Sequence, residues 1–337
     1  MPEAMDIWEG EGFTIQSLTA AINNEPYRPG QVSASGIFEE DGVTTTRVSI
    51  EMRDGKLSLV EPSQRGGPGE TTGDDDRQLI PFDIQHYQRD DAVLADEVQN
   101  ARAFGTEDQL ETIQERVERK GKRHAQDLTM TLEHQRVGAI KGIVTSKSGA
   151  TLHDLYNRFG ISVPSAVSLE LDVDTTNVAS VFQDVIFSIE DALDETYSGI
   201  HVFTGRDFHK ALWTHKSVRD TFLYNGGATV LRNDVPDKFE LFGATWERYR
   251  TGAKATADLG SPYIAAAEAR VVVKGVPDLF ITRFAPADYE ETVNTVGLPF
   301  YMKQIKKLNG KGRDIEVQMN AISLCTKPQV LRKLTLT

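Results

Sequence analysis

The feature that most constrains the fold of this chain is one long helical pattern between about Thr106 and Val144. It opens on a capping box, in which the Thr106 hydroxyl can accept from the first turn while Gln109 reaches back. A polar gap at residues 121–124 allows a kink. At ~1.5 Å per residue such a helix is on the order of 55 Å long, which predicts an extended molecule. Its periodic apolar residues are Leu110, Ile113, Val117, Leu128, Leu132, Ala139 and Ile143.

The residues before this helix predict an arm followed by a hairpin. The segment up to about residue 31 has few periodic apolar positions and several breakers, which favours an extended arm. Residues 43–60 alternate between apolar and polar side chains, and Asp54-Gly55 suits the tight turn of a hairpin. Residues 62–77 are rich in glycine and aspartate and cannot bury enough apolar surface to pack alone. We therefore expect a mobile excursion after the hairpin.

The residues after the helix alternate between β-like and helical patterns, which predicts a compact α/β region over about 163–284. One helix is expected at residues 178–193, capped by Thr175 or Thr176. A short strand at 200–203 leads into a helical stretch at 205–215. Toward the end of the chain, β patterns are expected at 315–319, 321–326 and 330–334.

The charge balance limits the classes of partner. Lys and Arg number 37 against 50 Asp and Glu, so the net charge of -13 lacks the basic excess of a dedicated nucleic-acid-binding protein. The basic run Arg116, Arg119, Lys120, Lys122 and Arg123 could face DNA, but a solvated helix face is the favoured interpretation. The N-terminus has no signal-peptide pattern and the sequence has no long apolar run, so no export or membrane anchor is expected.

A search for catalytic and metal-binding motifs predicts none. The pairs His124/His134 and His209/His215 lack the spacing of zinc ligands on one helix face. Lys147 and Lys311 lie near glycines without a P-loop pattern, and the lone Cys325 is expected to be a small core residue. Asp172 and Asp174 have the alternate spacing with which carboxylates can surround a cation. A metal-assisted hydrolase that uses them is therefore kept as a remote alternative. We expect no catalytic residue, no metal and no cofactor.

The C-terminal third carries a specific resemblance. Residues 275–280 lead into the run from Phe284 to Thr295, then Gly297-Leu298-Pro299 and residues 301–304. This run resembles the signature of the phage major capsid protein E family, the lambda-type capsid subunits. Residues 316–328, and more weakly 80–82 and 202–212, are also similar, so the resemblance extends from about Val32 onward. The signature positions, expected to be structural, are Pro286, Asp288, Tyr289, Thr292, Asn294, Gly297 and Pro299.

The resemblance implies an α+β chain with the Hong Kong 97-type capsid fold. Its parts would be an N-terminal arm at residues 1–31 and an extended β-hairpin loop at 32–82. A spine helix with part of the peripheral domain would occupy 83–162, and an axial domain about 163–284. Strands of the peripheral domain would occupy 285–337. Arg65, Gly66, Gly67, Asp74, Asp75 and Asp76 of the extended loop are the tentative assembly residues.

The function that the resemblance implies is that of a major capsid protein of a tailed phage, which is not an enzyme. Such subunits would assemble through pentamers and hexamers into an icosahedral shell around double-stranded DNA, without sequence specificity and without a membrane. The implied partners are a portal protein and, in some systems, scaffolding, protease and decoration proteins. The subunit would be assembled in the host cytoplasm and reside in the virion capsid. An encapsulin-like nanocompartment shell is the alternative with the same fold.

Overall fold

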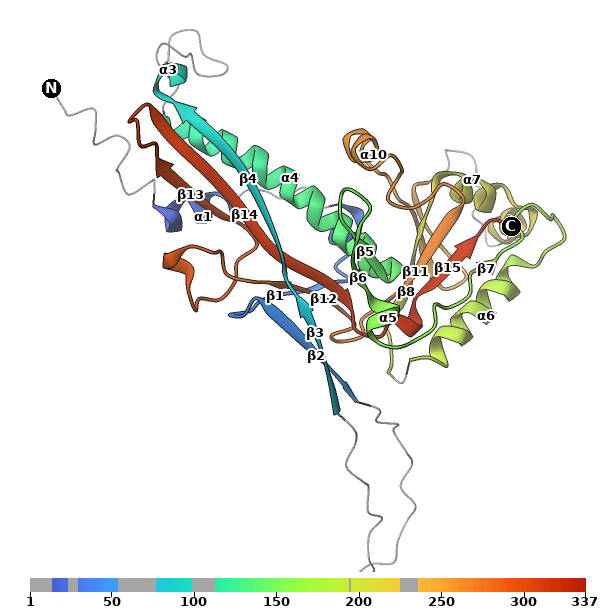
Figure 1. Ribbon diagram of the computed structural model, residues 1–337. Helices are drawn as coiled ribbons and strands as arrows, with labels where there is room; N and C mark the ends of the chain where they lie inside the picture. Colours follow the sequence, from blue (N-terminus) through green and yellow to red (C-terminus); the bar gives the residue numbers. More distant parts are fainter. Residues whose placement is uncertain (1–13, 24–29, 54–76, 99–112, 194, 225–235) are drawn as a thin grey trace, which may run out of the picture. The chain divides into compact units, whose positions relative to one another are not determined.

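The computed structural model describes residues 14–23, 30–53, 77–98, 113–193, 195–224 and 236–337 (Figure 1). The chain forms two compact units. The first consists of residues 1–48, 83–136 and 281–323, and the second of residues 49–82, 137–280 and 324–337. Both units draw on distant stretches of the sequence.

The first unit is built on a five-stranded sheet. Its strand order is β1 (Glu39–Gly42), β12 (Phe280–Phe284), β14 (Gly312–Cys325) and β13 (Tyr301–Lys306), and β4 (Gln85–Leu94) also pairs with β14. β1 is parallel to β12, whereas β13 and β4 are antiparallel to β14. Ile315, Val317 and Met319 alternate along β14 and are fully buried, as the sequence pattern predicts.

Two helices cover the core of this sheet. Leu18 and Ile22 of α1 (Ile15–Asn23) join Val117, Leu128 and Leu132 of α4 (Ile113–Lys141) in one buried apolar cluster with the strands. α1 is a correction to the expected extended arm, since residues 15–23 are helical. Its three buried residues, Leu18, Thr19 and Ile22, have the spacing of an amphipathic helix, but a pattern within nine residues is too short to stand out in the sequence.

The predicted long helix is confirmed as α4 over its described part. The helix is continuous from Ile113 to Lys141, through the polar gap at residues 121–124; its expected start at 106–112 lies outside the described residues. It ends before the predicted residue 144, because Gly142 takes the left-handed conformation with φ of 83°. Residues 143–145 then form β5 (Ile143–Thr145), paired with β6 (Thr151–Asp154).

The second unit contains a six-stranded mixed sheet. The strand order is β7 (Val167–Ser168), β15 (Arg332–Thr335), β11 (Glu268–Lys274), β8 (Gly199–Thr204), β10 (Ala244–Arg248) and β9 (Lys238–Leu241). The helices of this unit include α5 (Leu155–Arg158), α6 (Val178–Glu190), α7 (Arg206–Thr214), α8 (Lys216–Tyr224) and α10 (Ala253–Leu259). The Trp246 ring is fully buried, 4.8 Å from Phe182 and 6.4 Å from Phe208 between ring centroids.

The elements predicted for this unit are confirmed with small corrections. The helix expected at 178–193 is α6, which ends at Glu190, and its cap is Asn177 rather than Thr175 or Thr176. The Asn177 side chain accepts from the Ser180 N–H at 3.3 Å, the geometry that amide side chains favour at helix starts.

Two further differences concern the strands. The β patterns expected at 315–319 and 321–326 belong to one continuous strand, β14, because Asn320 between them is satisfied by side-chain hydrogen bonds within the sheet. The strand expected within residues 43–60 is β2 (Arg47–Arg53), and the structure pairs it with β3 (Arg77–Asp83). The predicted turn at Asp54-Gly55 lies outside the described residues.

Candidate assembly elements

The signature segment forms a loop between β12 and β13 that satisfies its own polar groups. The Thr292 hydroxyl, which is buried, lies 2.7 Å from the Ala287 carbonyl and 3.0 Å from the Tyr289 carbonyl. The Thr295 hydroxyl donates to the Thr292 carbonyl at 2.7 Å, and the backbone turns through a short 3-10 helix at Glu290–Thr292. These contacts stabilise the turn from within the loop itself.

Two positions of the loop depend on backbone conformation. Asn294 lies in the left-handed region with φ of 59°, which asparagine tolerates better than most residues. Gly297 packs so closely that a Cβ atom would lie 2.0 Å from the Phe284 carbonyl oxygen. Its N–H donates to the Val43 carbonyl at 3.0 Å, and the Val43 N–H donates to the Phe284 carbonyl at 2.8 Å. Gly297 therefore ties this loop to the segment that follows β1.

Tyr289 anchors the loop to the sheet. Its ring is buried and contacts Ala287 and Tyr301, while the Lys303 ammonium lies 4.8 Å from the ring centroid. Its hydroxyl donates to the Glu316 carboxylate at 3.3 Å. Burial and the Glu316 charge raise the pKa of the Tyr289 hydroxyl far above its ordinary range, so it remains a neutral donor.

Asn320 of β14 holds the other end of the loop. Its side-chain Nδ2 donates to the Pro286 carbonyl at 2.9 Å, and its backbone carbonyl accepts from the Ala285 N–H at 2.9 Å. Its Oδ1 therefore accepts from His86 Nδ1 at 2.7 Å, which fixes the proton of that imidazole on Nδ1. The sequence singled out Pro286 but not His86, which is distant in the chain.

The remaining signature positions do not share these structural roles. Asp288 is exposed, and Pro299 is half-buried before the buried Phe300. Between them the loop exposes three apolar side chains, with 65% of Val293, 58% of Val296 and 44% of Leu298 accessible. Apolar side chains that are exposed on a loop can form part of a protein contact surface.

A buried carboxylate on α4 binds the N-terminal segment of the first unit. The Glu133 carboxylate accepts from the Val32 N–H at 2.8 Å, the Ser33 N–H at 3.0 Å and the Ser33 hydroxyl at 2.6 Å. These donors belong to the start of the short helix α2 (Gln31–Ala34), so Glu133 supplies its N-terminal cap from a distant part of the sequence.

One turn further along α4, Arg136 binds the next part of the same segment. Its guanidinium is 1% exposed, pairs with Glu40 at 2.6 Å and donates to the Thr282 hydroxyl at 3.3 Å. It also lies 5.5 Å from the centroid of the Phe38 ring. Residues three apart share one face of a helix, so Glu133 and Arg136 together hold residues 32–40. Neither residue stands out in the sequence, because spacing does not identify the partners of a buried charge.

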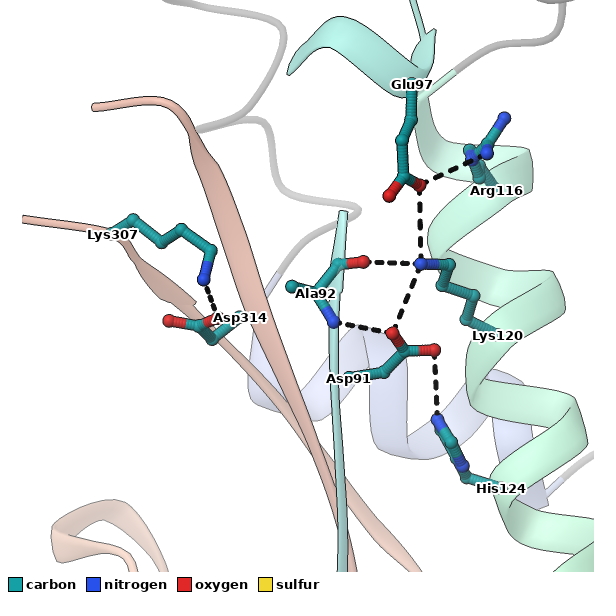
Figure 2. Close-up of polar contacts among 8 residues, drawn as sticks. All are labelled: Asp91, Ala92, Glu97, Arg116, Lys120, His124, Lys307 and Asp314. Carbon is teal, nitrogen blue, oxygen red and sulfur yellow. Dashed lines mark hydrogen bonds and ion pairs between the residues drawn. The ribbon is translucent and has the colours of Figure 1, made fainter. Parts of the chain in front are cut away.

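The N-terminal part of α4 is joined to β4 by an ion-pair network. Figure 2 shows the Lys120 ammonium between Asp91 and Glu97, at 3.2 and 3.4 Å, and it also donates to the Ala92 carbonyl. Arg116 pairs with the same Glu97 oxygen at 3.1 Å. Two residues of the basic run that could have faced DNA are thus engaged within the unit.

Asp91 is the centre of this network. Its Oδ1 accepts from the Ala92 N–H at 2.7 Å, and its Oδ2 lies 3.4 Å from His124 Nε2 (Figure 2). Partial burial acts to raise the pKa of the carboxyl, but the Ala92 N–H, Lys120 and His124 outweigh it, so the pKa of Asp91 is lowered.

The candidates for metal and catalytic chemistry are not brought together. Asp172 and Asp174 are both exposed in a turn, and His209 and His215 each bind separate carbonyls, of Pro236 and Val173. Among the described residues no group of three or more His, Cys, Asp or Glu could hold a metal ion. Burial raises the pKa of the Cys325 thiol to about 12, as suits the expected core residue.

The expected assembly residues of the extended loop lie outside the described residues; they are Arg65, Gly66, Gly67, Asp74, Asp75 and Asp76. The structure describes the base of the extended loop, where β2 pairs with β3 and Arg47 pairs with Asp83 at 2.7 Å on the surface. Within the described part of the chain, no helix is both long and apolar enough to cross a membrane.

Comparisons with known proteins agree with one another. A family model described as phage major capsid protein E matches residues 14–336. A major capsid protein of Pseudomonas phage KPP10 is 28% identical, with 95% of this chain and 96% of the relative covered. The major capsid protein of Salmonella phage Felix O1 is 22% identical, with 96% of each chain covered.

Solved structures show the same fold at low identity. A crystal structure of a putative capsid protein of a prophage of E. coli CFT073 matches with a TM-score of 0.57, 10% identity and coverage of 96% of this chain and 99% of the other. The capsid structure of cyanophage P-SCSP1u matches with a TM-score of 0.53 and 10% identity, covering 92% of this chain and 89% of the other.

Proposed function

The chain belongs to the phage major capsid protein E family, and on that basis we propose that it acts by assembling with copies of itself into the capsid shell of a tailed phage. Its fold is the Hong Kong 97-type α+β capsid fold. The observation that carries the proposal is the family match across residues 14–336, together with phage relatives of nearly the same length. Binding energy between subunits would take the place of catalysis.

The proposed division of labour follows the family order. Residues 1–31 would be the arm, 32–82 the extended loop, 83–162 the spine with part of the peripheral domain, 163–284 the axial domain and 285–337 the peripheral strands. The joining of α4 with β4, β13 and β14 in the first unit supports a peripheral domain made from both ends of the chain. The six-stranded sheet of the second unit supports an axial domain.

The contacts proposed for assembly lie in two places. Arg65, Gly66, Gly67, Asp74, Asp75 and Asp76 would contact a neighbouring copy through the extended loop. The signature loop would contact another through Val293, Val296 and Leu298, whose exposure supports a protein interface. Pentamers and hexamers would form the icosahedral shell around double-stranded DNA. A portal protein, and scaffolding, protease or decoration proteins, would be further partners during assembly in the host cytoplasm.

Electron microscopy of the purified full-length protein, alone and with candidate scaffolding proteins, tests the proposal. Closed shells, or rings of five and six subunits, are expected. Replacing Asp74, Asp75 and Asp76 by Asn should reduce their yield. A matched control replaces the exposed Asp172 and Asp174 by Asn, which should leave the yield unchanged. A protein that stays monomeric under every assembly condition would contradict the proposal.

A further inference from the structure

The second unit contains a cluster of three cations. Arg270 of β11 lies directly opposite Lys333 of β15 in the antiparallel register, so the two like charges project from the same face of the sheet. Like charges placed opposite each other destabilise a strand pair. Lys141, at the C-terminal end of α4, completes the cluster, because the charges of Arg270 and Lys333 both act on its ammonium.

One carboxylate pairs with two of the three cations. Glu268 pairs with Arg270 at 3.2 Å and also with Lys333. Burial would raise the pKa of Glu268, but Lys333 and Arg270 outweigh it and lower the pKa, so the carboxyl is ionised at neutral pH. The cluster therefore holds three positive charges against one negative charge.

Two donors in this cluster are left without partners. The Nε of Arg270 is buried and makes no hydrogen bond with any residue that the structure describes. The Lys141 side chain is half-buried, and its ammonium makes no ion pair within the described ranges. Burial, which disfavours the charged ammonium, followed by the charge of Arg270, lowers the pKa of Lys141 to about 8. An unpaired buried donor such as Arg270 Nε is costly unless a ligand satisfies it.

The surroundings position Lys141 rigidly. The Tyr156 hydroxyl donates to the Lys141 carbonyl at 3.3 Å, and the Tyr156 ring packs against Gly142, where a Cβ atom would lie 2.3 Å from the ring. The neighbouring Arg332 does not add to the unpaired charge, since its Nε donates to the Ser188 hydroxyl at 3.0 Å and its other nitrogens donate to carbonyls.

We propose that Lys141, Arg270 and Lys333 form an oxyanion-binding site, with Glu268 as the internal carboxylate that pairs with Arg270 and Lys333 when no ligand is bound. A phosphate or carboxylate offers the oxygen acceptors that the free Lys141 ammonium and Arg270 Nε require. Two sources supply this chemistry: a free phosphate, and a carboxylate of a second copy of this chain, whose 50 acids outnumber its 37 bases.

Titration calorimetry of the full-length, unassembled protein with inorganic phosphate tests the site, independently of whether shells form. The wild type should bind phosphate at millimolar concentrations or below. Lys141→Met and Arg270→Gln should each weaken binding about tenfold or more, the loss expected for one charged hydrogen bond. Lys147→Met is the matched control, because this lysine of the same unit is 71% exposed, and it should bind as the wild type does.

Glu268→Gln is a control for the possibility that the other variants bind less phosphate because they misfold. Removing the competing carboxylate should tighten phosphate binding about tenfold, an increase that a misfolded protein cannot give. Weaker binding by Glu268→Gln, unchanged binding by Lys141→Met and Arg270→Gln, or no phosphate binding by the wild type would each overturn the proposal.

A second arm separates the two sources. If assembled shells bind phosphate with the same stoichiometry per subunit as free subunits, the site takes a free oxyanion. If shell formation abolishes phosphate binding at a site that free subunits possess, a carboxylate of a neighbouring copy occupies it. Both results support an oxyanion site and differ only in the source of the ligand.

Discussion

At the scale of one residue, a single buried charge on α4 should make a measurable contribution to the stability of the subunit. Replacing Arg136 by Met should lower the free energy of unfolding by about 2 kcal/mol. The substitution removes the guanidinium, so Glu40 loses its charged partner and the buried Thr282 hydroxyl loses a donor, while Glu40 stays partly hydrated. Denaturant unfolding of the unassembled subunit measures the change.

Arg47→Met provides the control for Arg136. Arg47 pairs with Asp83 at a similar distance of 2.7 Å, but the two side chains are 62% and 65% exposed. Its removal should cost less than about 0.5 kcal/mol. Equal losses in the two variants would show that burial of Arg136 contributes nothing.

Gly297 permits a further prediction at the scale of one residue. Gly297→Ala should destabilise the first unit by about 2 kcal/mol or more, because the added methyl group meets the Phe284 carbonyl, which is backbone and cannot turn away. Gly199→Ala is the control, since a Cβ there would meet no atom within 4 Å. Thermal unfolding followed by circular dichroism should separate the two variants, and similar midpoints would refute the packing argument.

At the scale of elements, the attachment of α4 to β4 should depend on pH. The pKa of Asp91 is lowered from 3.8 in the folded chain, so its contribution is complete above that value and is lost as the pH falls through the folded pKa. Asp91→Asn should therefore cost stability at pH 7 by less than about 1 kcal/mol, given that the side chain is 36% exposed.

The difference between Asp91→Asn and the wild type should vanish in acid below the folded pKa. Unfolding curves collected across this range measure it, with the exposed Asp172→Asn as a control that should track the wild type throughout. A difference that persists unchanged in acid would mean that the ionised carboxylate of Asp91 is not what joins the elements.

The elements also show where sequence reasoning succeeds. α6 and β14 have apolar residues at the period of their own structure, so Val178, Phe182 and Val185, or Ile315 and Val317, could be assigned to a buried face from spacing alone. The signature loop was located by its resemblance to a family. Its internal bonds, such as that from Thr292 to Ala287, required the structure.

Contacts between distant segments could not be predicted in the same way. Neither the capping of α2 by Glu133 nor the hydrogen bond between His86 and Asn320 leaves a local pattern, because each joins residues far apart in the chain. The opposition of Arg270 and Lys333 appears only once the strand register is known. Local periodicity specifies elements, whereas the pairing of elements specifies sites.

At the scale of the whole molecule, the signature loop should matter for association more than for folding. The double variant Val293→Ser and Val296→Ser should unfold like the wild type, because both side chains are already largely exposed. Its yield of shells in electron micrographs should fall, since apolar area is lost from the proposed contact. Val163→Ser, 63% exposed in the second unit, is the control.

Loss of subunit stability in the double variant, or shell yields equal to those of the wild type, would contradict a role for this loop in assembly. The first result would mean that the two exposed valines contribute to the stability of the subunit itself. The second would leave the loop as an internal structural feature only.

The pairing of β1 with β12 and of β4 with β14 has a consequence for how the protein is made. Glu39 lies beside Ile281, and Gln85 beside Ala321, so the central sheet of the first unit needs strands from both ends of the chain. During synthesis at about 5–20 residues per second, the early strands must wait many seconds for their partners. A nascent chain on the ribosome therefore lacks a finished first unit and can join a growing particle only after its translation is nearly complete.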